Sequence, residues 1–154
     1  MVKKPAENQI SELLEVWHEL ESVYEEYAKG LGTQYSMLRV LSVLYGTKEV
    51  ITQKDIAELS FIPKQTVNAI ITNLYKNDYV ELKELAHDRR NKSVSLTPSG
   101  EKYAAALVQE MTKAERDSWS KLSKAQRSAI VDNMQLFKDI FRRALGMQGT
   151  SRKI

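Results

Sequence analysis

The fold is decided by residues 52–98, which read TQKDIAELSFIPKQTVNAIITNLYKNDYVELKELAHDRRNKSVSLTP. Thr52 followed by Asp55 is a capping-box pattern, which predicts the start of a short helix. Pro63 suits the first turn of a second helix, since it has no N–H to lose, and this helix runs to about Lys76. The short helix is expected to point three apolar residues inward: Ile56, Ala57 and Leu59. Two helices joined by a tight turn predict a helix-turn-helix.

The second helix of this stretch has one apolar and one polar side when its residues are placed about 100° apart. The residues expected on the buried side are Val67, Ile70, Ile71, Leu74 and Tyr75. The residues expected to face outward, or to flank that face, are Lys64, Gln65, Thr66, Asn68, Ala69, Thr72, Asn73 and Lys76. No acid occurs from Phe61 to Asn77, so no carboxylate on this helix repels a phosphate.

The outward residue types match the edges of DNA base pairs. Gln and Asn side chains can pair with adenine at two points, and the methyl groups of Ala69 and Thr72 can meet a thymine methyl. Lys64, in the first turn, suits a phosphate beside the helix N-terminus. We therefore predict that this helix reads the major groove; the alternative is a polar surface that happens to lack acids.

After this helix the apolar period changes from about 3.6 to 2, which predicts a two-stranded hairpin. Val80 and Leu82 alternate with polar residues, Val94 and Leu96 do so again, and the polar segment 86–92 is expected to be a loop. Arginine fits the narrow minor groove, where the potential of DNA is most negative. The tip residues expected to contact DNA are Asp88, Arg89, Arg90 and Lys92.

Helical patterns flank this region on both sides. The first helix ends near residues 30–32, and another runs over residues 35–45. Thr97-Pro98 opens a long helix, and Ser123 with Gln126 caps the last one. The sequence thus predicts a mainly α fold of the α+β class: a winged helix-turn-helix with a two-stranded wing and long N- and C-terminal helices.

The terminal helices carry more large apolar residues than one winged helix protomer can bury. The clearest of them are Trp17, Tyr24, Trp119, Phe137 and Phe141. Burying them between two copies predicts a C2 homodimer with two equivalent recognition helices. These helices would lie about 34 Å, or one DNA turn, apart, which predicts a palindromic binding site.

Composition excludes several classes of function. The 154 residues fit one domain, and the 42% hydrophobic and 28% charged content excludes wholesale disorder. Without cysteine there is no disulfide framework and no thiol chemistry. The sequence has no apolar span and no signal segment, so we expect a cytoplasmic protein without membrane contact. The net charge of +3 decides little, although an acidic start and a modestly basic middle suit contact between one region and a polyanion.

No arrangement of residues suggests catalysis. His18 and His87 lie on different elements, and no glycine-rich loop is present to hold a phosphate. We expect no enzyme activity, no cofactor and no metal. A metal sensor would have to rely on His18 with carboxylates such as Glu21.

The sequence resembles the MarR family of bacterial transcriptional regulators over essentially its whole length. The resemblance rests on residues 64–68 (KQTVN), 73–74 (NL) and 78–80 (DYV), the wing signature Asp88-Arg89-Arg90, and residues 96–100 (LTPSG). The family often has Gly where Asp78 stands. The turn here must therefore form without glycine, and Asp tolerates this better than most residues.

The resemblance implies a single MarR-like domain over residues 1–154. Residues 35–96 would form the winged helix DNA-binding lobe. Residues 6–30 and 98–146 would form a dimerisation lobe in which the first and last helices of two copies intertwine. The fourth helix of the chain would enter the major groove, and Arg90 would reach the minor groove from the wing tip.

The resemblance also implies a response to a ligand, since many members of the family are repressors released by small phenolic or amphipathic molecules. The candidate ligand residues, from the junction of the first two helices, are Trp17, His18, Tyr35, Met37 and Arg39. These side chains can equally be plain core residues. The second class of function is a winged helix used as a protein–protein interaction scaffold without DNA binding, which would have no need for the two wing arginines.

Overall fold

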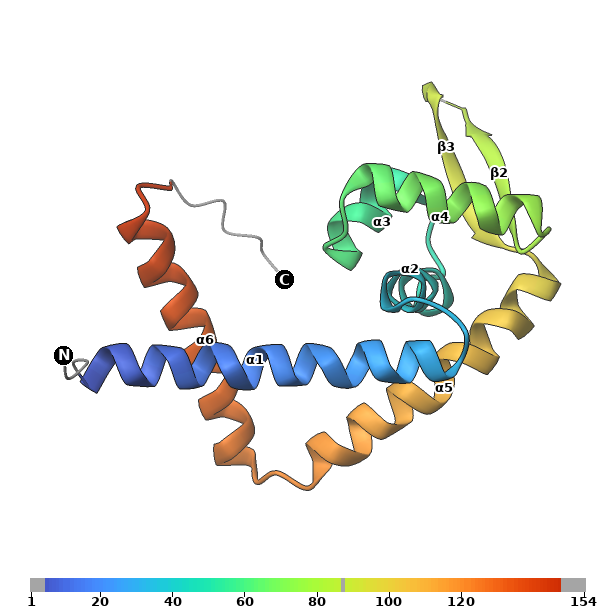
Figure 1. Ribbon diagram of the computed structural model, residues 1–154. Coiled ribbons are helices and arrows are strands. Elements are labelled where there is room, and N and C mark those ends of the chain that lie inside the picture. The colour runs from blue at the N-terminus through green and yellow to red at the C-terminus, as the bar shows by residue number, and fades with distance from the viewer. Residues whose placement is uncertain (1–4, 87, 148–154) are drawn as a thin grey trace. The chain divides into compact units, whose positions relative to one another are not determined.

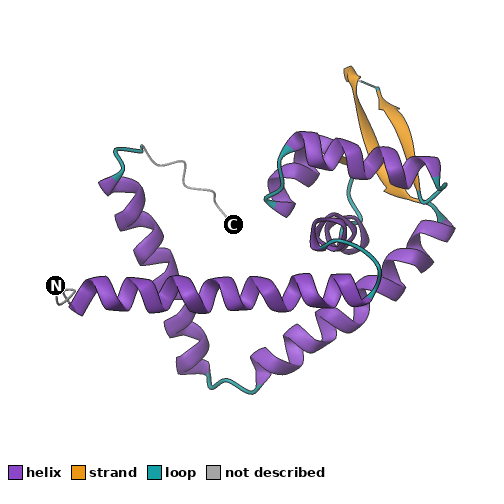
Figure 2. Ribbon diagram, viewed as in Figure 1, coloured by secondary structure: helices purple, strands orange, loops and turns teal. Residues whose placement is uncertain are grey.

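The computed structural model describes residues 5–86 and 88–147. Its elements in chain order are α1 (Pro5–Gly30), α2 (Tyr35–Gly46), β1 (Ile51–Thr52), α3 (Gln53–Ser60), α4 (Lys64–Lys76), β2 (Val80–Leu85), β3 (Asp88–Leu96), α5 (Pro98–Ser120) and α6 (Lys124–Ala144) (Figures 1 and 2). The mainly α fold of the α+β class is confirmed, with α3 and α4 as the helix-turn-helix and β2 and β3 as the wing. Among the described residues, no helix is long and apolar enough to cross a membrane.

The chain divides into two compact units, Met1–Glu110 and Met111–Ile154. This division falls inside α5, whereas the lobes expected from the sequence, with boundaries at residues 35, 96 and 98, remain a prediction. The first unit contains a three-stranded antiparallel sheet of order β1-β3-β2, which packs with the helix-turn-helix. The second unit contains α6, which buries none of its residues.

One hydrophobic core lies within the first unit, under α4 and the sheet. Its members come from every element between α2 and the first half of α5, and the most deeply buried are Val40, Leu41, Ile56, Val67, Ile71, Leu74, Val80 and Ala104. The residues buried on α4 are Val67, Ile70, Ile71 and Leu74, as predicted. Burying this side of α4 fixes its opposite side toward solvent.

Three predicted caps are present. Thr52 and Asp55 form a reciprocal capping box at the start of α3, and Ser123 and Gln126 form another at the start of α6. Thr97 Oγ1 accepts the backbone N–H of Gly100 at 3.0 Å, which caps α5. Each cap satisfies an N–H that the first turn of a helix leaves without a partner, so these ends are defined locally.

Several details of the prediction were wrong. Residues 51–52 form a third strand, β1, which pairs with β3 through Ile51 opposite Val94. β3 begins at Asp88, so most of the segment expected as a loop is strand. Pro63 lies at the N-cap position of α4 rather than inside its first turn. A two-residue strand shows no alternation of its own, and the wing strands gain their length from pairing with each other.

Leu59 and Tyr75 were predicted to point inward and are 56% and 55% exposed. Leu59 lies about 110° around α3 from the centre of the side formed by Ile56, Ala57 and Ser60. Ser60 can be buried there because its hydroxyl donates to the Ile56 carbonyl at 2.6 Å. Tyr75 likewise lies about 90° from the centre of the buried side of α4.

Replacing Thr52 by alanine should lower the free energy of unfolding by about 1 kcal/mol at neutral pH, because it removes the α3 cap. The pKa of Asp55 is lowered mainly by the Thr52 side-chain hydrogen bond, then by the Thr52 backbone N–H. The ionised cap therefore stabilises the fold above the ordinary Asp pKa of 3.8 and is lost as pH falls through the lowered value. Chemical denaturation of both proteins between neutral pH and pH 3 measures this; a difference that does not shrink in acid would contradict it.

Candidate nucleic-acid interface

The outward side of α4 is a continuous polar surface. All eight residues predicted to contact the major groove are exposed: Lys64, Gln65, Thr66, Asn68, Ala69, Thr72, Asn73 and Lys76. Lysines at its two ends, Lys64 and Lys76, carry its only charges. The side chains lie as predicted, and their contact with DNA remains a prediction.

The turn between α3 and α4 sets the start of this surface. Phe61 ends α3 in the left-handed conformation, with φ 55° and ψ 36°. The Ile62 N–H donates to the Ala57 carbonyl at 3.2 Å, and the Ile62 side chain is buried in the core. The N-cap residue Pro63 makes no side-chain hydrogen bond to the first turn of α4. A helix N-terminus of this kind suits an anion.

The turn between α4 and β2 is held by the start of α5. Asp78 adopts φ 58°, the left-handed conformation expected for a turn that forms here without glycine. Its carbonyl accepts the Thr97 hydroxyl at 2.7 Å and the Ser99 hydroxyl at 3.0 Å. The Thr97 N–H donates to the Tyr79 carbonyl at 3.0 Å. Three hydrogen bonds from Thr97 and Ser99 thus hold the turn where α4 passes into the wing.

Two further contacts make this turn rigid. The rings of Tyr79 and Tyr103 stack with centroids 4.2 Å apart and an interplanar angle of 3°. Burial raises the pKa of Tyr103, and the nearby Tyr79 raises it further, so the Tyr103 hydroxyl stays neutral. Gly100 packs so closely that a Cβ there would lie 1.8 Å from the Tyr79 carbonyl oxygen. Residues 96–100 carried part of the family resemblance in the sequence. In the structure Thr97, Ser99 and Gly100 hold the wing base, which is the turn between α4 and β2.

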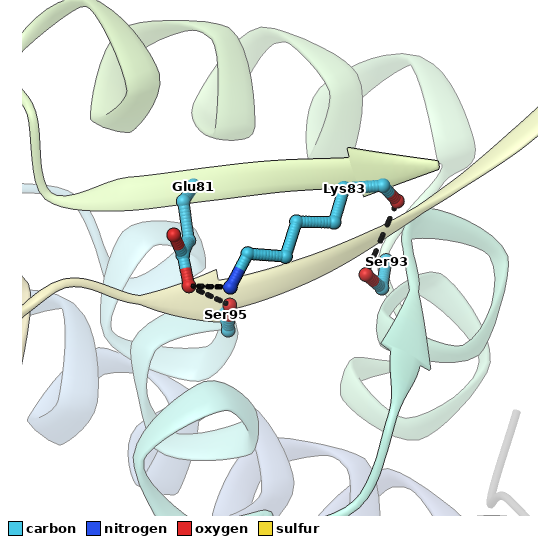
Figure 3. Close-up of polar contacts among 4 residues, drawn as sticks. All are labelled: Glu81, Lys83, Ser93 and Ser95. Carbon is cyan, nitrogen blue, oxygen red and sulfur yellow. Dashed lines mark hydrogen bonds and ion pairs between the residues drawn. The ribbon is translucent and has the colours of Figure 1, made fainter. Parts of the chain in front are cut away.

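The wing is a regular antiparallel ladder with a bulge between Glu84 and Leu85. Figure 3 shows its solvent face, where Lys83 Nζ and the Ser95 hydroxyl both donate to Glu81 Oε1, at 2.8 and 3.1 Å. These two hydrogen bonds lower the pKa of Glu81, and the bond from Lys83 has the larger effect. Glu81 is therefore ionised and paired with Lys83, so its negative charge is partly neutralised at the wing surface.

The wing tip is described only in part. The backbone of residues 88–90 lies in β3, whereas the side chains of Asp88, Arg89 and Arg90 lie outside the described residues. Lys92, also predicted to contact DNA, is exposed. His87 lies outside the described residues.

The ligand candidates fall into two groups of contacts in the first unit. Trp17 Nε1 donates to Glu21 Oε1 at 3.0 Å, and His18 Nδ1 lies 3.3 Å from Glu21 Oε2. Tyr35 stacks on Tyr24 at 4.7 Å, and its ring lies 5.7 Å from the Arg39 guanidinium carbon. Met37 packs against the core. The two groups of contacts have no residue in common, and a shared ligand pocket stays a prediction.

One residue near the second group was missed. The hydroxyl of Ser42 is buried and has no hydrogen-bond partner among the described residues. Tyr35, Arg39 and Ser42 are spaced four and three residues apart, so they share a side of α2. A serine in a largely apolar helix gives no signal in sequence. Among the described residues no group of histidine, aspartate and glutamate is suited to a metal ion.

The comparisons with known proteins agree with this geometry. The model of the MarR family matches residues 31–91. The solved structure of NMB1585, a MarR family regulator from Neisseria meningitidis, is 23% identical over 90% of this chain and 96% of that one, with a TM-score of 0.76. Staphylococcus aureus MepR in its DNA-binding conformation is 23% identical, covering 86% and 98%, with a TM-score of 0.70.

A third solved structure concerns regulation by a small molecule. Bordetella bronchiseptica BpsR, whose DNA binding is regulated by 6-hydroxynicotinic acid, is 19% identical over 90% of this chain and 99% of that one, with a TM-score of 0.69. No curated protein matches the chain in sequence.

The helix-turn-helix of α3 and α4 and the wing of β2 and β3 define a winged helix fold. The model of the MarR family matches residues 31–91, and the likeness to the solved NMB1585 structure shows that the chain shares the fold of that regulator.

Proposed function

We propose that this chain is a homodimeric repressor that reads a palindromic operator through α4 and is released by a small ligand. The observation that carries the proposal is the outward side of α4, which is fully exposed, polar and free of acids from Phe61 to Asn77. The central residues Gln65, Ala69 and Thr72 would meet base edges in the major groove. Arg90 would enter the minor groove from the wing, and the protein would act in the cytoplasm.

Exposed apolar surface supports the homodimer. Six large apolar side chains of α1 and six of α6 are exposed: Ile10, Leu14, Val16, Trp17, Leu20 and Val23, and Ile130, Val131, Leu136, Phe137, Ile140 and Phe141. Exposed apolar side chains in such number on one helix favour an interaction site. A second copy that covers both helices would place two α4 helices for one palindrome.

The ligand would bind beside α2. Arg39 and Ser42 together offer a cation and an unpaired hydroxyl, which suit the carboxylate or hydroxyl groups of a small aromatic compound. Tyr35 would supply a ring for stacking. The regulation of BpsR by 6-hydroxynicotinic acid is of this chemical kind, and binding by this chain would shift its dimer away from the DNA-bound arrangement.

Selection of bound duplexes from random DNA at physiological salt should return one palindrome for the wild-type protein. Gln65→Ala and Asn68→Ala should each change the preferred base at symmetric positions, with about 1–3 kcal/mol lost per specific contact. Gln34→Ala, which removes an exposed glutamine at the start of α2, is the matched control and should leave the preference unchanged.

Failure of the wild-type protein to enrich any palindrome would support the scaffold function instead. Unchanged base preference in both α4 variants would show that another surface reads the operator. Binding of the wild-type protein should also weaken steeply as salt rises, because Lys and Arg contacts with phosphate release counterions.

A further inference from the structure

Tyr75 differs from every other tyrosine of the protein. The chain has seven tyrosines, and the other six are at least partly buried. Four of them stack in pairs, Tyr24 on Tyr35 and Tyr79 on Tyr103, and the Tyr45 hydroxyl accepts a hydrogen bond from Gln109 at 2.7 Å. Tyr75 is 55% exposed and has no contact of these kinds with a described residue. Burial in the protomer therefore does not explain why an aromatic residue stands here.

The position of Tyr75 on α4 suggests what its ring and hydroxyl contact. Placed about 100° apart, Gln65, Thr72 and Lys76 form the centre line of the outward side, and Tyr75 lies about 80° to one side of this line. Lys64 and Asn68 lie on the same edge. Lys64 and Tyr75 are eleven residues apart, or about 16 Å along the helix axis. Lys64 at the start of α4 and Tyr75 near its end are thus two long side chains with polar tips on the same edge of the helix.

A helix in the major groove has base edges below its centre line and sugar-phosphate walls along its two edges. Long side chains on an edge reach the walls, whereas short ones on the centre line reach the bases. The Tyr75 hydroxyl is a neutral donor of the kind that contacts phosphate oxygens, and its ring can cover a deoxyribose. No acid of α4 competes for the hydroxyl.

We propose that Tyr75 is a DNA-contacting residue whose hydroxyl donates to a backbone phosphate at the opposite end of α4 from Lys64. The inference rests on the proposed operator binding and adds a residue that the sequence pattern assigned to the core. A phosphate contact anchors the register of the helix in the groove and carries no base preference. Tyr75 and Lys64 together fix the helix against one wall of the groove.

Tyr75→Phe tests the hydroxyl alone, and Tyr27→Phe on α1 is the matched control. The affinity of the full-length Tyr75→Phe protein for the selected operator should fall about tenfold, since a hydrogen bond to a charged group is lost. Affinity for random duplex should fall by a similar factor, and the midpoint of thermal unfolding should not change. The salt dependence should keep its slope, because no cation is removed, whereas Lys64→Gln should flatten it. Tyr27→Phe should bind like the wild type.

Equal affinities of Tyr75→Phe and the wild type for the operator would overturn the assignment of Tyr75 while leaving the proposed function intact. A changed preference at a single base pair would also overturn it, since the hydroxyl would then read a base edge. If the wild-type protein selects no operator, the proposed function fails, and the Tyr75 contact fails with it.

Discussion

Gly100→Ala is expected to unfold the wing base and abolish operator binding. An added Cβ would lie 1.8 Å from the Tyr79 carbonyl oxygen and 2.7 Å from the Tyr79 carbonyl carbon, and neither atom belongs to a flexible side chain. The first turn of α5 would have to move away from the α4–β2 turn. This movement would break the Thr97 N–H bond to Tyr79 and both hydroxyl bonds to Asp78.

The loss in the free energy of unfolding should be about 3 kcal/mol or more, since overpacking against rigid backbone adds to the broken hydrogen bonds. Alanine normally stabilises a helix relative to glycine by about 1 kcal/mol. A lower free energy of unfolding for Gly100→Ala would therefore show that the contact with Tyr79 outweighs helix propensity. Thermal and denaturant unfolding measure the change, and operator binding should be lost in parallel.

Gly46→Ala is the matched control for this effect. Gly46 is the last residue of α2, and a Cβ there meets nothing within 4 Å. Its substitution should be neutral or stabilising by a few tenths of a kcal/mol, about what reduced freedom of the unfolded chain provides. A Gly100→Ala protein as stable as the wild type would show that α5 is not held against Tyr79 in solution.

The fold was predictable because its signals are local. Thr52 with Asp55, Thr97-Pro98 and Ser123 with Gln126 each mark a helix start through a bond that a few residues make among themselves. The apolar period then assigns each segment to helix or strand. β1 was missed, since two residues become a strand only through the pairing of Ile51 with Val94, which are far apart in sequence.

The site was predictable in its central part and not at its edges. The outward set from Gln65 to Lys76 follows from periodicity alone, because four strongly apolar residues define the opposite side. Tyr75 was misplaced because an aromatic residue near the boundary of that side can turn either way, and only the neighbouring elements decide. The role of Thr97 and Ser99 was invisible, since their partner is the carbonyl of Asp78, about twenty residues earlier.

A second large effect on DNA binding is expected from Leu20→Glu, which places a charge in the middle of the apolar side of α1. Leu20 is 57% exposed in the protomer, and Val16, Trp17 and Val23 around it are also exposed. In the proposed homodimer these side chains are covered, so the new carboxylate would be buried without a partner in both copies. A buried unpaired charge costs several kcal/mol, which is enough to separate the subunits at micromolar concentration.

The folded protomer should survive Leu20→Glu, because this part of α1 contributes nothing to the core: Ala28 is the only buried residue among the described side chains of that helix. Sedimentation should therefore find a monomer, and circular dichroism should find an unchanged helix content. Operator affinity should fall at least about 100-fold, because each protomer reads only half of the palindrome. Ser22→Glu, which adds the same charge to the polar side of α1, is the matched control and should remain a dimer with wild-type affinity.

A Leu20→Glu protein that still sediments as a dimer would place the interface elsewhere. A monomer that keeps full affinity would instead mean that one winged helix suffices, and the palindrome would then have no structural basis.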